Sequence, residues 1–205
     1  MKSGTKKGNK NRPDPIEDTI MISPLEQRND VLAQLLRAVT LLTESMAPVL
    51  VSGAGTNIGY AIKGSRDTSD VAAVAGGFTV KNDTVQAAGP CGFSADTEMA
   101  KVLLTAMKFD PEIRCAATLH YTKEAGSIIE DMFLECCTID RRLQPSDVST
   151  MDWGVAACCK NGVPEVMVDP GTTESLAKIY LFGENPTVVA GNTIMLSNRI
   201  IRIEL

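Results

Sequence analysis

The spacing of apolar residues predicts a chain in which helices and strands alternate. The segment Ser23-Pro24-Leu25-Glu26 combines a capping box with a proline in the first turn, which predicts a helix start. Apolar residues then recur at helical spacing and give this helix one apolar face: Leu32, Leu35, Leu36, Val39, Leu42 and Met46. Pro48 ends the pattern, and a strand-like run at 49–51 leads into a Gly/Asn turn.

Short apolar runs between turn residues predict strands along the rest of the chain. They fall at 60–62, 78–80, 85–87, 113–121, 166–168 and 179–181, with Asn82-Asp83 as the turn of a hairpin. Helices are predicted after a cap at Ser94 or Asp96, around 128–133, and from Ser149 to the Asn161-Gly162 pair. After Pro186 the pattern fits a helix and a strand equally. Because strands and helices are interspersed, the fold class is α/β.

Length and charge add a domain prediction. The 205 residues fit a flexible basic leader, 1–22, followed by a single domain, 23–205. The leader carries four lysines and one arginine without interleaved aromatic residues, and the net charge is −5, so a solvated tail is favoured over a nucleic-acid contact. No apolar run is long enough to span a membrane, and the basic start leads into acidic residues rather than a signal peptide. A cytoplasmic protein is therefore expected.

The cysteines and the single histidine narrow the chemistry. Two adjacent pairs, Cys136-Cys137 and Cys158-Cys159, have small or apolar neighbours and lack metal-ligand spacing, which predicts reduced, buried thiols rather than a metal site. His120 is the only histidine, so a three-histidine zinc site is excluded. In its predicted strand, His120 is either a structural or solvated residue or an acid/base whose partners the sequence does not name.

A first charged loop follows the Gly/Asn turn. Asp67 with Asp70 three residues later fits a capped helix start. The same segment also fits an anion and amine site, in which Arg66 binds a phosphate and a carboxylate pairs with an amino-bearing ring. Both interpretations remain open at this point and are compatible with each other.

A second charged block runs through Asp140-Arg141-Arg142 to Ser149-Thr150-Met151-Asp152. A helix N-terminus with free N–H groups, two hydroxyls and nearby arginines suits a phosphate, although capping of a helix with Trp153 in the core also explains it. Further on, Asp169-Pro170-Gly171 is either a plain turn or a small backbone nest for an anion.

These segments resemble the ThiN domain, the archaeal-type thiamine-phosphate synthase domain. The resemblance rests on Gly55-Thr56-Asn57-Ile58, on Arg66-Asp67, on Asp140-Arg141 with Ser149-Thr150-Met151, and on Leu181-Phe182-Gly183, and it extends over residues 46–189. It implies a three-layer α/β/α fold with a mixed sheet, similar to class II (AraD-like) aldolases. It also implies a ligand site, for which these residues are the candidates: Asn57, Arg66, Asp67, Asp140, Arg141, Ser149, Thr150, Met151 and Gly171.

The chain departs from the family pattern where catalysis is expected. A family arginine is replaced by Gly77, and a family histidine by Glu98. Loss of a cation and gain of an anion should impede departure of pyrophosphate. The resemblance therefore implies binding of thiamine phosphate or its phosphorylated pyrimidine or thiazole precursors, with weak or no synthase activity. The alternative is an active synthase, which joins the two precursors and releases pyrophosphate. Mg²⁺ is compatible with a pyrophosphate ligand, and a homodimer is compatible with the family.

Overall fold

The computed structural model describes residues 23–52, 55–143 and 150–203, with only the backbone of residues 150–152 and 203. Within these ranges the helices are α1 (Pro24–Ser45), α2 (Thr97–Ala106), α3 (Lys123–Asp131), α4 (Thr150–Cys158) and α5 (Pro186–Ile203). The strands are β1 (Asn57–Ala61), β2 (Val71–Val74), β3 (Phe78–Lys81), β4 (Thr84–Ala87), β5 (Cys91–Phe93), β6 (Cys115–His120), β7 (Cys136–Thr138), β8 (Val166–Asp169) and β9 (Lys178–Gly183). The predicted leader, 1–22, lies outside the described residues.

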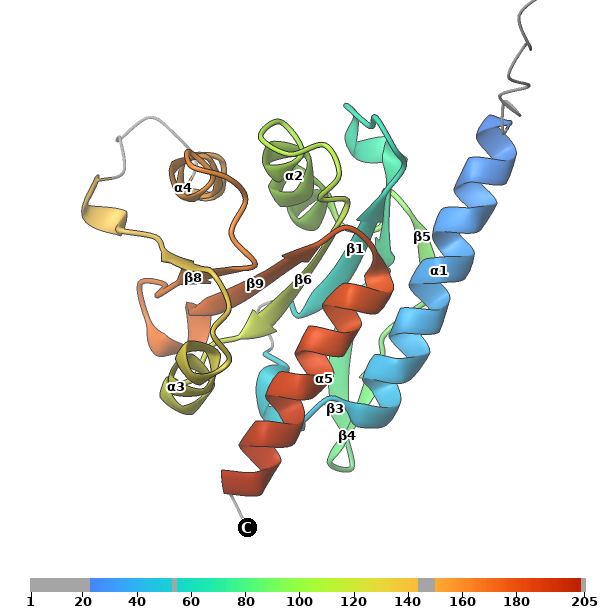
Figure 1. Ribbon diagram of the computed structural model, residues 1–205. Coiled ribbons are helices and arrows are strands. Elements are labelled where there is room, and N and C mark those ends of the chain that lie inside the picture. The colour runs from blue at the N-terminus through green and yellow to red at the C-terminus, as the bar shows by residue number, and fades with distance from the viewer. Residues whose placement is uncertain (1–22, 53–54, 144–149, 204–205) are drawn as a thin grey trace, which may run out of the picture.

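A seven-stranded mixed sheet forms the middle layer of the molecule. Its strand order is β5-β2-β1-β6-β9-β8-β7, and all neighbours are antiparallel except β7 and β8. Helices α1, α5 and α3 cover one face, and α2 and α4 cover the other (Figure 1). The three-layer α/β/α arrangement with a mixed sheet, expected from the resemblance, is therefore present.

Each face of the sheet has its own apolar core. One core contains Leu35 and Leu42 of α1 and Leu196 of α5, packed against Ile58 and Leu119 of the sheet. The other contains the buried faces of α2 and α4 packed against the alternate strand residues. Strand side chains point to opposite faces in turn, so the parity of a strand residue decides which core or site it faces.

Most predicted elements are confirmed with shifted ends. Ser23 accepts from the Glu26 amide at 3.2 Å and Glu26 accepts from the Ser23 amide at 2.8 Å, so the capping box of α1 is present. The hairpin of β3 and β4 turns at Asn82 and Asp83, which have φ of 49° and 57°. The apolar face of α1 was predicted too wide, because Leu36 is largely exposed.

One local prediction is wrong, and another is confirmed only as far as the cap residue. Residues 49–51 do not form a strand, because Pro48–Leu50 is a 3-10 turn that is followed by an extended residue. The helix start predicted at Asp67 is a single 3-10 turn, Thr68–Asp70, which Asp67 caps before the chain continues directly into β2. The segment after Pro186, which was ambiguous between helix and strand, is helix α5.

The prediction of reduced, buried cysteines is wrong for Cys137 and Cys158 but confirmed for Cys159. Cys137 of β7 and Cys158 of α4 form a disulfide, with their Cα atoms 5.7 Å apart. Cys136 is exposed and Cys159 is buried, both as free thiols. Cys136 and Cys137 are adjacent on β7 and point to opposite faces of the sheet, so only Cys137 can meet the partner cysteine on α4. Among the described helices, none has the length and apolar character that crossing a bilayer requires.

Candidate functional site

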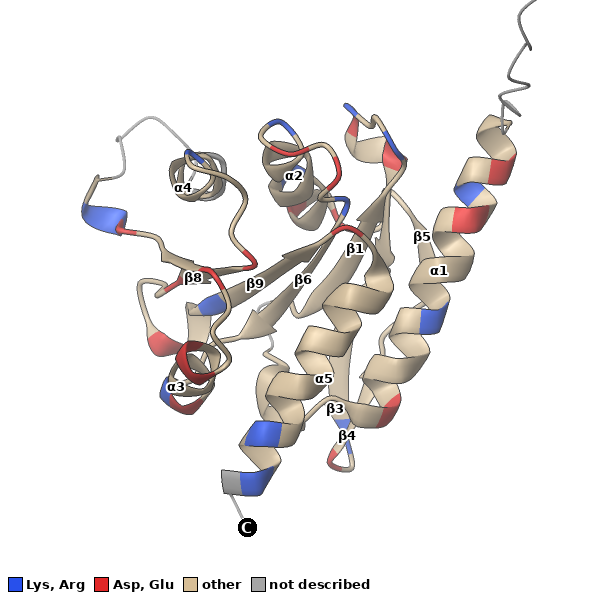
Figure 2. Ribbon diagram, viewed as in Figure 1, with Lys and Arg blue, Asp and Glu red and all other residues tan. Residues whose placement is uncertain are grey.

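Few charged residues lie on the strands of the seven-stranded sheet, and those that do lie at one end of it. Within the described part of the seven-stranded sheet, the only Lys, Arg, Asp or Glu residues are Asp169 at the end of β8 and Lys178 at the start of β9 (Figure 2). They are register neighbours, and Lys178 also pairs with His120 of β6. A buried sheet position does not favour a charge, so this pair requires partners or a ligand.

Neighbouring strands contribute polar residues at the same end. Asn57 begins β1 and is paired in register with Thr118 of β6, which in turn is paired with Tyr180 of β9. Tyr180 belongs to the core beneath α2 and α4, so these aligned residues face the same two helices. The end of the sheet under the start of α2 is therefore polar, whereas its middle is apolar.

Two adjoining cavities lie at this polar end. A cavity of about 330 Å³ is lined by residues from the Gly/Asn turn, from the β2–β3 turn and from the start of α2: Gly55, Asn57, Gly76, Gly77, Ala95, Asp96, Thr97 and Glu98. A cavity of about 40 Å³ shares Gly55, Asp96 and Glu98 with it and continues to Thr118, Lys178 and Tyr180. The two positions that depart from the family pattern, Gly77 and Glu98, thus line the same cavity.

Asn57 is fixed by the fold rather than free to move. Its amide nitrogen donates to the Val74 carbonyl at 3.0 Å and to the Asp96 carboxylate at 2.7 Å, and its amide oxygen accepts from the Val74 amide at 3.2 Å. The side chain thereby extends the pairing between β1 and β2 beyond the strand ends. Asp96 caps α2 through the Met99 amide at 3.0 Å, so Asn57 also anchors this helix start.

Gly77 has a conformation that a side chain does not fit. The amide of Gly77 donates to the Val74 carbonyl at 3.1 Å, and both Gly76 and Gly77 have positive φ, 74° and 68°. A Cβ atom on Gly77 would lie 2.3 Å from the carbonyl oxygen of Thr56. That oxygen accepts from the Phe78 amide at 2.8 Å, so it is held in place. The backbone itself occupies the space into which a side chain would start.

A buried ion pair closes the far side of this sheet end. Arg141 donates from Nε and Nη2 to the two carboxylate oxygens of Asp169, each at 2.7 Å, and this hydrogen bonding raises the pKa of Arg141. Asp169 is buried and also accepts from the Gly171 amide at 3.0 Å. Gly171 has φ of 66° and three backbone atoms 2.8 Å from an added Cβ, so this turn requires glycine. Both predicted residues, Arg141 and Gly171, meet at Asp169.

Lys178 and Glu98 carry the loosely held charges of the site. Their nearest charged atoms are 4.0 Å apart, and the Lys178 side chain is 18% exposed whereas that of Glu98 is 80% exposed. Tyr180, beside them, is deeply buried, and this burial raises the pKa of its hydroxyl well above 10, so the hydroxyl stays protonated. His120, at the end of β6, has Nδ1 3.2 Å from the Val49 carbonyl oxygen, which agrees with a structural role.

Three other predicted site residues, Arg66, Asp67 and Asp140, line neither of the two cavities at the polar end. Arg66 and Asp67 follow the end of β1, roughly 15 Å from the strand start by strand geometry, and Arg66 lines a different cavity with Leu104 and Met107. Asp67 accepts from the Ser69 amide at 2.8 Å. Asp140 is exposed to solvent on one side and accepts from Arg142 at 2.8 Å.

The remaining predicted residues are Ser149, Thr150 and Met151. Ser149 lies outside the described residues. The backbone of Thr150 and Met151 is the first turn of α4, and their side chains are likewise outside the description. Their predicted contribution to a phosphate site therefore stays a prediction.

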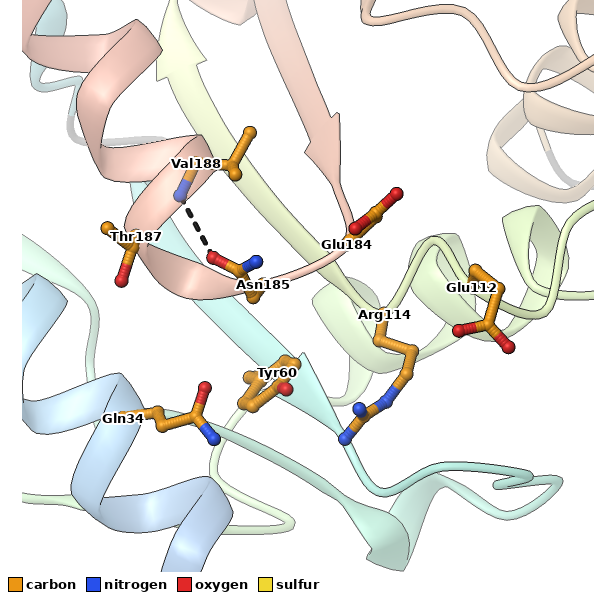
Figure 3. Close-up of a pocket in the computed structure, with 8 residues that line it drawn as sticks. All are labelled: Gln34, Tyr60, Glu112, Arg114, Glu184, Asn185, Thr187 and Val188. Atoms are coloured by element: carbon orange, nitrogen blue, oxygen red, sulfur yellow. Dashed lines mark hydrogen bonds between the residues drawn. The ribbon is translucent and has the colours of Figure 1, made fainter.

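A larger cavity, of about 560 Å³, lies at the opposite end of the sheet (Figure 3). Its arginine, Arg114, donates from Nε and Nη2 to the Ala61 carbonyl oxygen and lies over the ring of Tyr60 at 4.7 Å. Glu112 and Glu184 border it as well. Its cation is thus engaged in holding β1 and its rim is acidic, so this cavity is the weaker candidate for an anionic ligand.

Sequence reasoning did not single out three charged residues that lie at the polar end. Asp96 was considered as a helix cap, Asp169 as part of a plain turn or a backbone nest, and Lys178 not at all. The available signal was the alternation of β9, in which Lys178 and Tyr180 occupy the same face and interrupt an otherwise apolar strand. Which neighbouring strands contribute to that face depends on sheet order, which alternation does not specify.

The fold and the site together define a mixed α/β domain with a small polar cavity at one end of its sheet. The family model described as thiamine-phosphate synthase ThiN matches residues 34–195, and this chain belongs to that family. A bifunctional thiamine biosynthesis protein ThiDN of Methanocaldococcus jannaschii is 33% identical over 162 residues, which are 77% of this chain and 38% of that protein. The chain thus spans well under half of that relative.

Solved structures agree with the family assignment. The C-terminal domain of protein MJ0236 has a TM-score of 0.79 at 27% identity, with 89% of this chain and 99% of that chain covered. The C-terminal domain of a phosphomethylpyrimidine kinase has a TM-score of 0.74 at 29% identity, with 82% and 98% covered. An aldolase II superfamily protein from Pseudomonas syringae, at 11% identity and a TM-score of 0.50 over 89% of this chain and 77% of that chain, shares the fold alone.

Proposed function

We propose that this ThiN domain binds thiamine phosphate, or a phosphorylated precursor of it, in the cavity at the polar end of the sheet, with weak or no synthase activity. A role in thiamine metabolism follows from the family. The proposal adds the ligand, the place and the loss of catalysis. The domain is further proposed to have the class II aldolase-like variant of the α/β/α fold, which the distant likeness to an aldolase II protein supports.

The single observation that carries the proposal is that Gly77 and Glu98 line one cavity. The resemblance implies an arginine and a histidine at these positions, which would face the departing pyrophosphate. Here the first position offers only backbone and the second an exposed carboxylate. Negative charge that develops in a transition state is stabilised by preorganised donors, and each missing donor costs about 10²–10³ in rate.

The residues present still suit the binding of a phosphate group, which does not require stabilisation of a departing pyrophosphate. Lys178 supplies a cation to the smaller cavity, and the buried hydroxyl of Tyr180 lies beside it. Arg141 is paired with Asp169, so in this proposal it holds the wall of the site. The donors for the phosphate are proposed to come from Ser149 and Thr150, near the start of α4. Arg66 and Asp67 are proposed as peripheral contacts only.

The test is a calorimetric titration of the protein with thiamine phosphate, paired with a synthase assay on the two phosphorylated precursors, each with and without Mg²⁺. We expect binding of thiamine phosphate and little or no product. Absence of binding by thiamine phosphate and by both precursors would refute the proposed ligand class.

An active synthase is the second candidate, and the cation Lys178 favours it. If Lys178 replaced the missing arginine, turnover would reach the roughly 1 per second or more that is common for enzymes. Such turnover in the unmodified protein, lost in Lys178→Met, would replace the binding proposal.

A further inference from the structure

The site holds five charged side chains, Asp96, Glu98, Arg141, Asp169 and Lys178: Arg141 and Asp169 neutralise each other, and Asp96 is held in place by hydrogen bonds but keeps its charge. Asp169 is matched by the two hydrogen bonds from Arg141. Asp96 is held by the Asn57 amide and the Met99 backbone amide. The loosely held charges that line the cavities are therefore one cation, Lys178, and one anion, Glu98.

These two charges differ in how firmly they are placed. Lys178 is mostly buried at the start of β9, an interior strand of the sheet, so its ammonium group has limited freedom to move. Glu98 lies in the first turn of α2 with most of its side chain in solvent, and its 4.0 Å pairing with Lys178 is at the outer limit of an ion pair. An incoming anion competes with a weak partner for Lys178 but remains close to the Glu98 carboxylate.

We infer that this cavity is selective for a single phosphate group and discriminates against diphosphates. The inference rests on the proposed function, because it concerns the ligand of the same cavity. One phosphate group is matched by Lys178. A second phosphate group meets the larger cavity, where the lining residues are the backbone of Gly76 and Gly77 and the carboxylates of Asp96 and Glu98.

The backbone at Gly77 prevents a side chain there from changing the charges that line the larger cavity. No side chain at Gly77 fits without displacing the Thr56 carbonyl, so the larger cavity gains no cation from the β2–β3 turn. Repulsion between like charges a few ångströms apart at a half-exposed site weakens binding by roughly fivefold or more. Asp96 and Glu98 both oppose a second phosphate group, and Glu98 is the one of the two whose charge can be removed without disturbing the cap of α2.

The experiment compares inorganic phosphate with pyrophosphate, and thiamine phosphate with thiamine diphosphate, by calorimetry at pH 8 and low salt with EDTA. EDTA is needed because Mg²⁺ would neutralise the diphosphates. For the wild type we expect the single phosphate of each pair to bind at least about fivefold more tightly. Glu98→Gln should bring each pair to within about twofold. Lys178→Met should weaken binding of inorganic phosphate about tenfold, with the unfolding midpoint recorded to confirm that this variant folds.

Glu112→Gln is the matched control. Glu112 is also an exposed glutamate paired with a lysine, Lys63, at 3.1 Å, but it lies at the opposite end of the sheet. It should leave both ratios as in the wild type.

The outcomes separate the two proposals. Equal affinity for phosphate and pyrophosphate in the wild type, or ratios that Glu98→Gln leaves unchanged, would overturn the inferred selectivity while binding of thiamine phosphate upholds the proposed function. Selectivity for phosphate over pyrophosphate, with no added affinity for thiamine phosphate, would support the inferred selectivity and count against thiamine phosphate as the ligand. Absence of binding by all four compounds would overturn the inferred selectivity, and failure of both phosphorylated precursors to bind as well would overturn the proposed function.

Discussion

Gly77→Ala tests whether the cavity owes its shape to a glycine-only turn. The added Cβ is expected to cost about 1–2 kcal/mol because φ is in the left-handed region, where Gly77 has a value of 68°. The contact of 2.3 Å with the Thr56 carbonyl adds the cost of displacing backbone, which for overpacked sites is about 1–3 kcal/mol. The expected loss of unfolding free energy is therefore about 2–5 kcal/mol.

Gly64→Ala is the control for the conformational part of this cost. Gly64 also has a positive φ, 78°, but an added Cβ would have no neighbour within 4 Å. Urea unfolding followed by circular dichroism should give a loss of only about 1–2 kcal/mol for this variant. If Gly77→Ala costs no more than Gly64→Ala, the argument that the Thr56 carbonyl blocks a side chain is refuted.

The same geometry changes what is expected of attempts to restore catalysis. From sequence alone, Gly77→Arg together with Glu98→His would be expected to raise turnover, because both act on the charge of the leaving group. In the structure Gly77→Arg must first displace the turn that Asn57 and Thr56 hold. We therefore expect the double variant to lose stability without gaining synthase turnover.

Three further outcomes are expected in unfolding experiments. Arg141→Ala should cost about 3–5 kcal/mol because it leaves a buried carboxylate unpaired, whereas Arg142→Ala, in an exposed pair, should cost about 0–1 kcal/mol; equal costs would contradict the burial argument. Cys158→Ser should cost about 3 kcal/mol by opening a closure of 21 residues, and its midpoint should no longer respond to dithiothreitol. Burial raises the pKa of the Cys159 thiol from 9.0 to about 11, so the folded state keeps a proton that the unfolded chain releases. Stability should therefore fall between about pH 9 and pH 11 by on the order of 2 kcal/mol, and a titration of the midpoint that is equally steep in Cys159→Ala would exclude this cause.

Local signals predicted elements well where a side chain acts on its own backbone. The capping box at Ser23 and the Asn82-Asp83 turn were confirmed because both depend on residues within four positions of each other. Residues 49–51 were misassigned because three apolar residues suit a strand and a buried 3-10 turn equally. The partner that distinguishes the two cases is supplied by the tertiary fold.

The candidate site could be predicted only in part for a similar reason. Gly77, Glu98 and Asn57, which the motif resemblance singled out, line one cavity in the structure. The resemblance also grouped Arg66 with them, because closeness in sequence does not reveal that β1 separates the two ends of the sheet. Lys178 and Asp169 were missed as a pair, since their proximity follows from the register of β8 and β9.

The position of β6 has a consequence for synthesis of the chain. β6 is the middle strand of the sheet, and its two neighbours are β1, which precedes it by more than fifty residues, and β9, which follows it by a similar interval. A nascent chain that has emerged only through β8 has an unpaired edge on β6 and lacks α5, which packs beside α1. The domain therefore completes its sheet late in translation, and fragments that end before Lys178 are expected to require chaperones or to aggregate.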